Sequence, residues 1–180
     1  TPAAERLGGG REFRLIAGLT ERINRGADLD ALLDTLHVAL REVVPCDRLS
    51  IGLLQADGHT LVLGPVRTDG QVALASGYHE SIEGSTLKPL LETGATRIIE
   101  DLEAYLAAKP SSQSTRQIVR EGMRSSLTVP LVVGDRRVGV MWFSSRTRAA
   151  YVRAHEDFMR CIAGHVAFVV EKAWLREENL

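Results

Sequence analysis

Polar and aromatic side chains interrupt several apolar stretches of this sequence, and such residues can supply the directional contacts that bind a small molecule. Ser50 and Thr128 stand within alternating aliphatic runs, and Trp142 is a large aromatic residue in a third run. Arg124 directly precedes a predicted strand, and Tyr105 lies in a connecting segment. Polar groups that converge in an otherwise apolar cavity are typical of small-molecule sites. Each side chain can also face solvent or the core, because the sequence alone does not fix strand register.

The two cysteines do not indicate redox or nucleophilic chemistry. Cys46 and Cys161 are too few and too widely separated for a disulfide framework. Cys46 precedes Asp47 at the start of a predicted strand, and Cys161 follows a helical pattern with apolar neighbours. Both contexts are typical of buried thiols. We therefore expect a reduced, cytoplasmic protein.

No catalytic or metal-binding pattern stands out. The histidines show no His-x-x-x-His spacing; they are His37, His59, His79, His155 and His165. The chain contains no G-x-x-x-x-G-K-[ST] phosphate loop, and Gly8-Gly9-Gly10 follows no strand. His155-Glu156-Asp157 falls at a predicted helix start, where the helix dipole favours acidic residues. We predict no catalytic residues and no metal site.

Length and charge limit the class of protein further. The 180 residues suit one domain, and 22 basic against 23 acidic residues give a net charge of −1. This balance, with no basic stripe, predicts no direct contact with nucleic acid or with an anionic membrane. No apolar run approaches the roughly 20 residues of a membrane-spanning helix, and residues 1–5 do not resemble a signal peptide. The missing initiator Met predicts a piece of a longer chain.

The periodicity of apolar residues predicts helices at both ends and strands between them. Helical spacing covers residues 12–25, a second helix follows the N-cap Asp28, and a long helix starts near residue 154. Short helices are expected over 85–92 and from the capping pair Ser114 and Gln117 to residue 121. Alternation predicts a half-buried strand around 49–53, and further strands over 60–66, 96–99, 126–133 and 137–144. Hairpin connections at Asp57-Gly58 and Gly134-Asp135 make antiparallel pairing, and hence an α+β fold, the prediction.

One ordered series of segments resembles the GAF domain family. The stretch from Gly122 to Leu131, Gly122-Met-Arg-Ser-Ser-Leu-Thr-Val-Pro-Leu, is followed by Gly134-Asp135 and Val138-Gly-Val-Met, as in the C-terminal half of GAF domains. Upstream, Asp28-Leu-Asp-Ala-Leu-Leu and Val44-Pro-Cys-Asp-Arg-Leu-Ser-Ile resemble the family's second helix and first strand. In this reading Pro130 belongs at a bulge or near a sheet edge, and Gly139 permits close approach of a covering helix.

The resemblance implies a central antiparallel sheet with the terminal helices on one face, and with loops and short helices that roof a ligand pocket on the other. We expect a flexible lead-in over residues 1–11, one domain over 12–175, and the start of a linker helix over 176–180. His79 falls in the roofing region and is the one histidine retained as a ligand candidate. The predicted ligand-binding set is Ser50, His79, Tyr105, Arg124, Thr128 and Trp142.

Membership of this family implies a sensory domain of a larger signalling protein, such as a histidine kinase, a cyclase or a sigma-54-type activator. The domain would form homodimers through its terminal helices and signal to an effector module on its C-terminal side. An alternative is a scaffold that binds no ligand and contributes only a dimer interface. A further alternative is an enzyme like free methionine sulfoxide reductase, which cycles cysteines in the pocket.

The ligand itself stays unknown at this stage. A covalently attached bilin needs a pocket cysteine, usually followed by histidine, but Asp47 follows Cys46. The Asn–Lys–Phe–Asp–Glu set of cyclic-nucleotide-binding relatives is missing from the middle region. We expect neither a covalent bilin nor haem.

Overall fold

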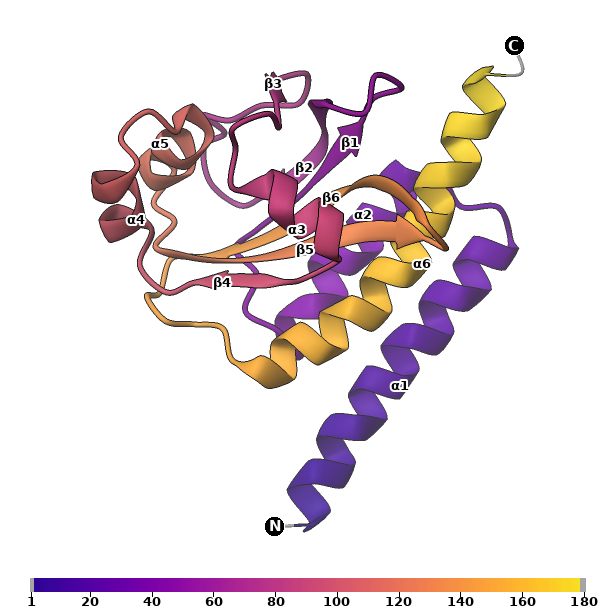
Figure 1. Ribbon diagram of the computed structural model, residues 1–180. Helices are drawn as coiled ribbons and strands as arrows, with labels where there is room; N and C mark the ends of the chain where they lie inside the picture. Colours follow the sequence, from indigo (N-terminus) through magenta and orange to yellow (C-terminus); the bar gives the residue numbers. More distant parts are fainter. Residues whose placement is uncertain (1, 179–180) are drawn as a thin grey trace.

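A six-stranded antiparallel sheet forms the centre of the computed structural model, which describes the backbone of residues 2–178 and the side chains of residues 10–175 (Figure 1). The spatial order of the strands is β3-β2-β1-β6-β5-β4. Their bounds are β1 Arg48–Leu54, β2 Thr60–Thr68, β3 His79–Ser81, β4 Arg97–Ile99, β5 Ser125–Val133 and β6 Arg136–Ser145. The tight hairpins β1–β2 and β5–β6 are those that the turn residues predict, and they meet where β1 pairs with β6.

The register of the strands gives each face of the sheet its own chemistry. Leu49, Phe143, Leu127 and Ile98 lie opposite one another across four strands, and the first three are fully buried. Because side chains alternate along a strand, the residues on either side of this row belong to the other face. One face is therefore aliphatic and aromatic, and the other carries most of the buried hydroxyl groups.

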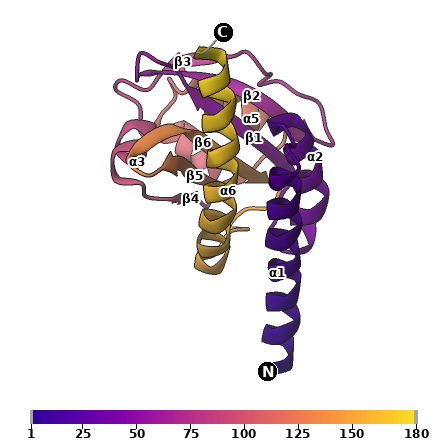
Figure 2. The same ribbon diagram turned by 90° about the vertical axis from the view of Figure 1, so that its right-hand side faces the viewer.

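Three helices form the layer on the apolar face, and the first of them packs mainly on the other two. They are α1 (Pro2–Asn24), α2 (Leu29–Ala39) and α6 (Arg153–Glu178). Leu32, Leu33 and Leu36 of α2 and Ile162 and Val166 of α6 are completely buried against this face. Figures 1 and 2 both show α1 beside α6, with the two helices running in the same direction. The expected pairing of the first and last helices is thus confirmed.

The polar face is covered by the segment between β2 and β5. This segment contains β3, α3 (Leu87–Thr93), β4, α4 (Leu102–Ala108) and α5 (Gln113–Arg120). A small apolar cluster, which includes Leu61, Leu87, Leu91 and Val140, packs α3 against β2 and β6. The predicted α+β architecture, with helices on one face and a roof on the other, is confirmed.

The first helix differs from the prediction. A flexible lead-in was expected over residues 1–11, whereas α1 begins at Pro2 and continues without a break. Glycine lowers helix propensity by about 1 kcal/mol relative to alanine, but it keeps its N–H group and does not clash as proline does. Gly8-Gly9-Gly10 therefore weakens the helix without ending it.

Two local predictions about the strands are also corrected. The strand around residues 49–53 was expected to be half-buried, but residues 48–52 are buried on both faces, because the polar face lies under the roof. Gly139 was expected to admit a helix; a Cβ there would instead lie 2.1 Å from the carbonyl oxygen of Gly52 on the neighbouring strand. Pro130 lies on β5, past the last residue that pairs with β4, and next to a register shift that follows Leu131. Both positions agree with the prediction of a bulge or a sheet edge.

Candidate functional site

A cavity of about 500 Å³ lies between the polar face of the sheet and the roof. This volume is within the roughly 300–1,000 Å³ of small-molecule sites. Its walls come from the strands below, from the β2–β3 connection at one side, and from α3, α4, α5 and their connections above. The expected pocket therefore exists, and its lining combines charged and hydroxyl-bearing side chains with apolar ones.

Two rows of cross-strand neighbours form the floor of the cavity. The first row runs from β1 to β4 through Ser50, Trp142, Thr128 and Arg97. The second row runs parallel to it through Arg48, Ser144, Ser126 and Ile99. Direct cross-strand partners have Cβ atoms about 5 Å apart, so each row is a continuous line of side chains. The floor thus combines hydroxyl groups, one indole and two guanidinium groups.

The indole ring of Trp142 lies against Gly52 of the neighbouring strand β1. A Cβ on Gly52 would lie 2.6 Å from the Trp142 ring. The neighbouring strand therefore has room for the indole only because residue 52 is glycine. The ring stays half-buried and open to the cavity.

Arg48 is a fully satisfied buried cation at one end of the floor. Its side chain is 2% exposed, that of Glu121 is 1% exposed, and Nε of Arg48 donates to Oε1 of Glu121 at 3.1 Å. Its other nitrogens donate to Ser50 Oγ at 2.8 Å and to the Leu74 carbonyl at 2.7 Å. The second carboxylate oxygen of Glu121 accepts from the Leu74 N–H group at 3.1 Å. This network joins β1, the β2–β3 connection and the end of α5.

Arg97 lies at the other end of the floor and has a different environment. Its Nη1 donates to Thr86 Oγ1 at 2.7 Å, and that hydroxyl is 2.9 Å from the Tyr105 hydroxyl. The guanidinium carbon lies 5.6 Å from the centroid of the Tyr105 ring, and Lys109 Nζ lies 6.0 Å from the same centroid. Burial lowers the pKa of Arg97, although an arginine keeps its charge in proteins.

Two polar atoms of the floor lack a partner. Thr128 is 1% exposed, and its Oγ1 is buried without a hydrogen bond; the same holds for Nε of Arg97. Among the described side chains, Tyr151 carries the only other buried polar atom in this condition. Buried polar groups are normally paired, so two such atoms on adjacent residues of one cavity mark this part of the floor as incomplete.

Four of the six predicted site residues line the cavity: Ser50, Tyr105, Thr128 and Trp142. The other two predicted residues, His79 and Arg124, lie outside the lining. His79 is exposed on the edge strand β3. Arg124 lies outside the lining, where its Nε pairs with Glu103 at 2.8 Å and its Nη1 donates to backbone carbonyls.

Sequence reasoning missed both arginines of the floor. Arg48 and Arg97 each stand in a predicted strand and alternate with aliphatic residues, as in Arg97-Ile98-Ile99. A charged residue at such a position is usually assigned to solvent. Only the roof, which comes from a distant part of the chain, turns this face into the interior.

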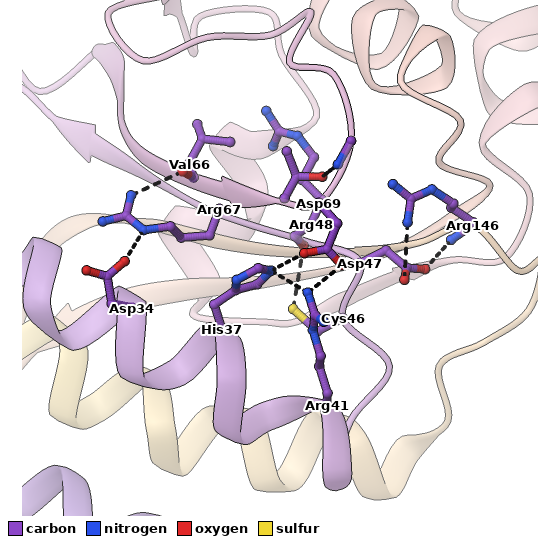
Figure 3. A network of polar contacts seen from close by, with 12 residues as sticks. Asp34, His37, Arg41, Cys46, Asp47, Arg48, Val66, Arg67, Asp69 and Arg146 are labelled. Carbon is purple, nitrogen blue, oxygen red and sulfur yellow. Dashed lines mark hydrogen bonds and ion pairs between the residues drawn. The ribbon is translucent and has the colours of Figure 1, made fainter.

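The cysteines lie away from the cavity lining. Cys46 is buried in the core on the helical side, where Sγ is 3.7 Å from the Arg48 carbonyl (Figure 3). Burial raises its pKa to about 12. Cys161 is exposed on α6. In this neighbourhood Arg41 contacts Asp69 at 2.6 Å and His37 at 3.0 Å, so the charged groups tie the helical layer to the end of β2.

The chain belongs to the GAF domain family, because the family's sequence profile matches residues 28–170. A search of curated protein sequences finds no match. Within the described part of the chain, no helix has the length and apolarity to cross a membrane.

Solved structures of GAF domains share the fold. The domain from a phosphoenolpyruvate-protein phosphotransferase of Coxiella burnetii is 15% identical, with a TM-score of 0.71 over 93% of this chain and 97% of that one. The domain from a two-component sensor histidine kinase of Bacillus halodurans is 21% identical, with a TM-score of 0.64 over 81% and 95%. A phycocyanobilin-bound domain from a cyanobacterial phytochrome is 15% identical, with a TM-score of 0.69 over 92% and 96%.

Proposed function

We propose that this chain is a small-molecule-sensing regulatory domain of a larger cytoplasmic signalling protein. The observation that carries the proposal is the roofed cavity of about 500 Å³, whose floor holds buried polar groups without partners. A domain that serves only as a spacer gains nothing from an incomplete polar interior, because each unpaired buried group costs free energy.

The connections of the cavity supply a route for a signal. The Arg48–Glu121 network fixes the end of α5 to β1, and β5, which carries Thr128, packs directly on α6. A ligand that contacts the roof and the floor together favours one relative position of the two. That preference then reaches α6 through the sheet.

We assign the output to an effector module on the C-terminal side, reached through α6. The structural neighbours support this class of host, since one comes from a sensor histidine kinase and one from a phosphoenolpyruvate-protein phosphotransferase.

Trp142 offers a direct test of ligand binding. The chain has two tryptophans, so Trp174→Phe leaves Trp142 on the cavity floor as the only indole. A panel of nucleotides, amino acids, organic acids, inorganic phosphate and neutral metabolites is titrated while fluorescence and the unfolding temperature are recorded. We expect at least one compound to change both.

Two matched variants locate the effect. Thr128→Val removes a hydroxyl from the floor, and Thr35→Val removes one from the exposed face of α2. Binding in the cavity predicts a weaker response in Thr128→Val and an unchanged response in Thr35→Val. A panel in which no compound changes either signal would replace the sensor with a scaffold.

The scaffold alternative has its own supporting observation. Phe13 on α1 is 72% exposed and Phe168 on α6 is 55% exposed. Each is a large aromatic side chain on a terminal helix, and aromatic residues are enriched at the centres of protein interfaces. We propose a homodimer through these helices, which is compatible with sensing and becomes the whole function if the cavity binds nothing.

We do not propose an enzyme. Catalysis like that of free methionine sulfoxide reductase needs two thiols close together in the pocket, but neither Cys46 nor Cys161 lines the cavity.

A further inference from the structure

We infer that the cavity binds a small organic oxyanion, a carboxylate or a phosphate group, through the guanidinium group of Arg97. This inference rests on the proposed sensing function and adds the chemical class of the ligand. It depends on a comparison between the two arginines of the floor, on the balance of charge around them, and on the hydroxyl groups nearby.

The two arginines differ in what neutralises them. Arg48 has a carboxylate, a hydroxyl and a carbonyl as acceptors, so each of its three guanidinium nitrogens makes a hydrogen bond. Arg97 interacts with the Thr86 and Tyr105 hydroxyls, leaves Nε without an acceptor, and has no ion pair with any carboxylate of the described side chains. The Arg97 side chain is half-buried, with its Nε atom fully buried, and a charge withdrawn from water in this way is normally paired. Arg97 therefore lacks a counter-ion that Arg48 possesses.

A second cation stands at the same end of the cavity. Lys109 and Arg97 both approach the Tyr105 ring, and Lys109 likewise has no carboxylate partner among the described residues. The carboxylates that line the cavity are engaged elsewhere. Glu83 pairs with Lys88 at 2.7 Å, and Glu80 accepts from the Tyr78 hydroxyl at 3.0 Å.

Hydroxyl groups complete the anion site. The Thr86 and Tyr105 hydroxyls lie beside the guanidinium group, and the unpartnered Thr128 hydroxyl belongs to the residue directly opposite Arg97 in the sheet. A guanidinium fork with neutral donors around it matches the oxygens of a carboxylate or phosphate. Trp142, the next residue in the same row, offers an apolar surface to the body of an organic anion.

The test uses simple probes on the Trp174→Phe protein at constant ionic strength, with sodium chloride as the reference salt. Acetate and succinate form the carboxylate arm, inorganic phosphate and glycerol phosphate form the phosphate arm, and adenosine and glucose form the neutral arm. We expect one of the two anionic arms to change Trp142 fluorescence and to raise the unfolding temperature above the chloride reference. The arm that responds identifies the source of the oxyanion.

Matched substitutions assign the effect to one side chain. Arg97→Met removes the proposed ligand contact, and loss of a charge-assisted hydrogen bond predicts at least about ten-fold weaker binding. Arg120→Met removes the same charge from an exposed position on α5 outside the cavity lining and leaves affinity unchanged. Equal affinity in Arg97→Met and in the parent protein would overturn the inference.

The unfolding temperatures of two variants without ligand test whether Arg97 has a purely structural role. Because Arg97 is half-buried without a counter-ion, we expect Arg97→Met to keep the unfolding temperature close to that of the parent, whereas Arg48→Met lowers it by leaving the buried Glu121 carboxylate unpaired. A similar fall in both variants would make Arg97 a structural residue and would contradict the inference. A response in the neutral arm alone would also contradict it while sensing stands. Silence in every arm would overturn the inference, and the wider metabolite panel then decides separately whether the sensing function stands.

Discussion

At the scale of single residues, one buried ion pair joins three segments beside the cavity. Arg48 and Glu121 are 73 positions apart, and both contact Leu74 of a third segment. Removing one partner of such a pair costs about 3–5 kcal/mol, because the remaining charge stays buried. The pair thus fixes how the end of α5, the β2–β3 connection and β1 are placed relative to one another.

Cys46 gives a prediction about reactivity and pH. Burial raises the pKa of its thiol from 9.0 to about 12, so the folded protein keeps the neutral form where the unfolded chain releases a proton. The contribution of this group to stability is therefore complete below pH 9 and is lost as the pH rises toward 12. At pH 9 we expect iodoacetamide to modify the exposed Cys161 rapidly, and Cys46 only after urea is added.

Mass spectrometry of the labelled peptides gives the readout, and a Cys161→Ser variant isolates the buried thiol. Modification of Cys46 in the folded protein at the rate of a free thiol would contradict the burial on which this prediction depends.

At the scale of elements, close contact between β1 and β6 holds the two hairpins together. A Cβ on Gly139 would lie 2.1 Å from the Gly52 carbonyl oxygen, and backbone atoms cannot move aside as a flexible side chain can. We expect Gly139→Ala to lower the free energy of unfolding by about 1–3 kcal/mol, as overpacking does.

A helical glycine provides the matched control for this substitution. Gly164 lies on the exposed side of α6, and a Cβ there meets no atom within 4 Å. Gly164→Ala should raise the free energy of unfolding by roughly 0.5–1 kcal/mol. Urea denaturation measures both changes, and an unperturbed Gly139→Ala would show that the strands separate at little cost.

The type and order of most elements were predictable from sequence, because apolar periodicity and capping residues act locally. The carboxylate of Asp28 accepts from the Ala31 N–H group at 2.9 Å, as expected for an N-cap. At α5 the local signal misled: Ser114 was predicted to cap the helix, but the structure begins it after Ser112, whose hydroxyl contacts Thr115.

The candidate site was only partly predictable, because a floor made of cross-strand rows depends on register. Ser50, Thr128 and Trp142 were found as polar or bulky exceptions in apolar strands, and they occupy one row. Arg97, the fourth member of that row, was missed, because its pairing with Thr128 joins strands separated by two helices in the sequence. Long-range pairing of this kind leaves no local signal.

At the scale of the whole molecule, the exposed aromatic residues predict self-association. We expect the domain to dimerise, and the double substitution Phe13→Glu with Phe168→Glu to weaken the dimer by ten-fold or more, since buried aromatic residues dominate interfaces. Sedimentation velocity over a range of concentrations measures the dissociation constant. Val72→Glu, at another exposed apolar position but in the β2–β3 connection, should leave it unchanged. A native protein that is monomeric at every concentration would refute the interface.

The shared direction of α1 and α6 also bears on how such domains combine. The chain enters at the amino end of α1 and leaves at the carboxyl end of α6, which point to opposite ends of the molecule (Figures 1 and 2). Modules joined by continuing these two helices would follow one another along a line instead of doubling back. A small axial shift of one helix relative to the other would then change the distance between the modules attached at the two ends.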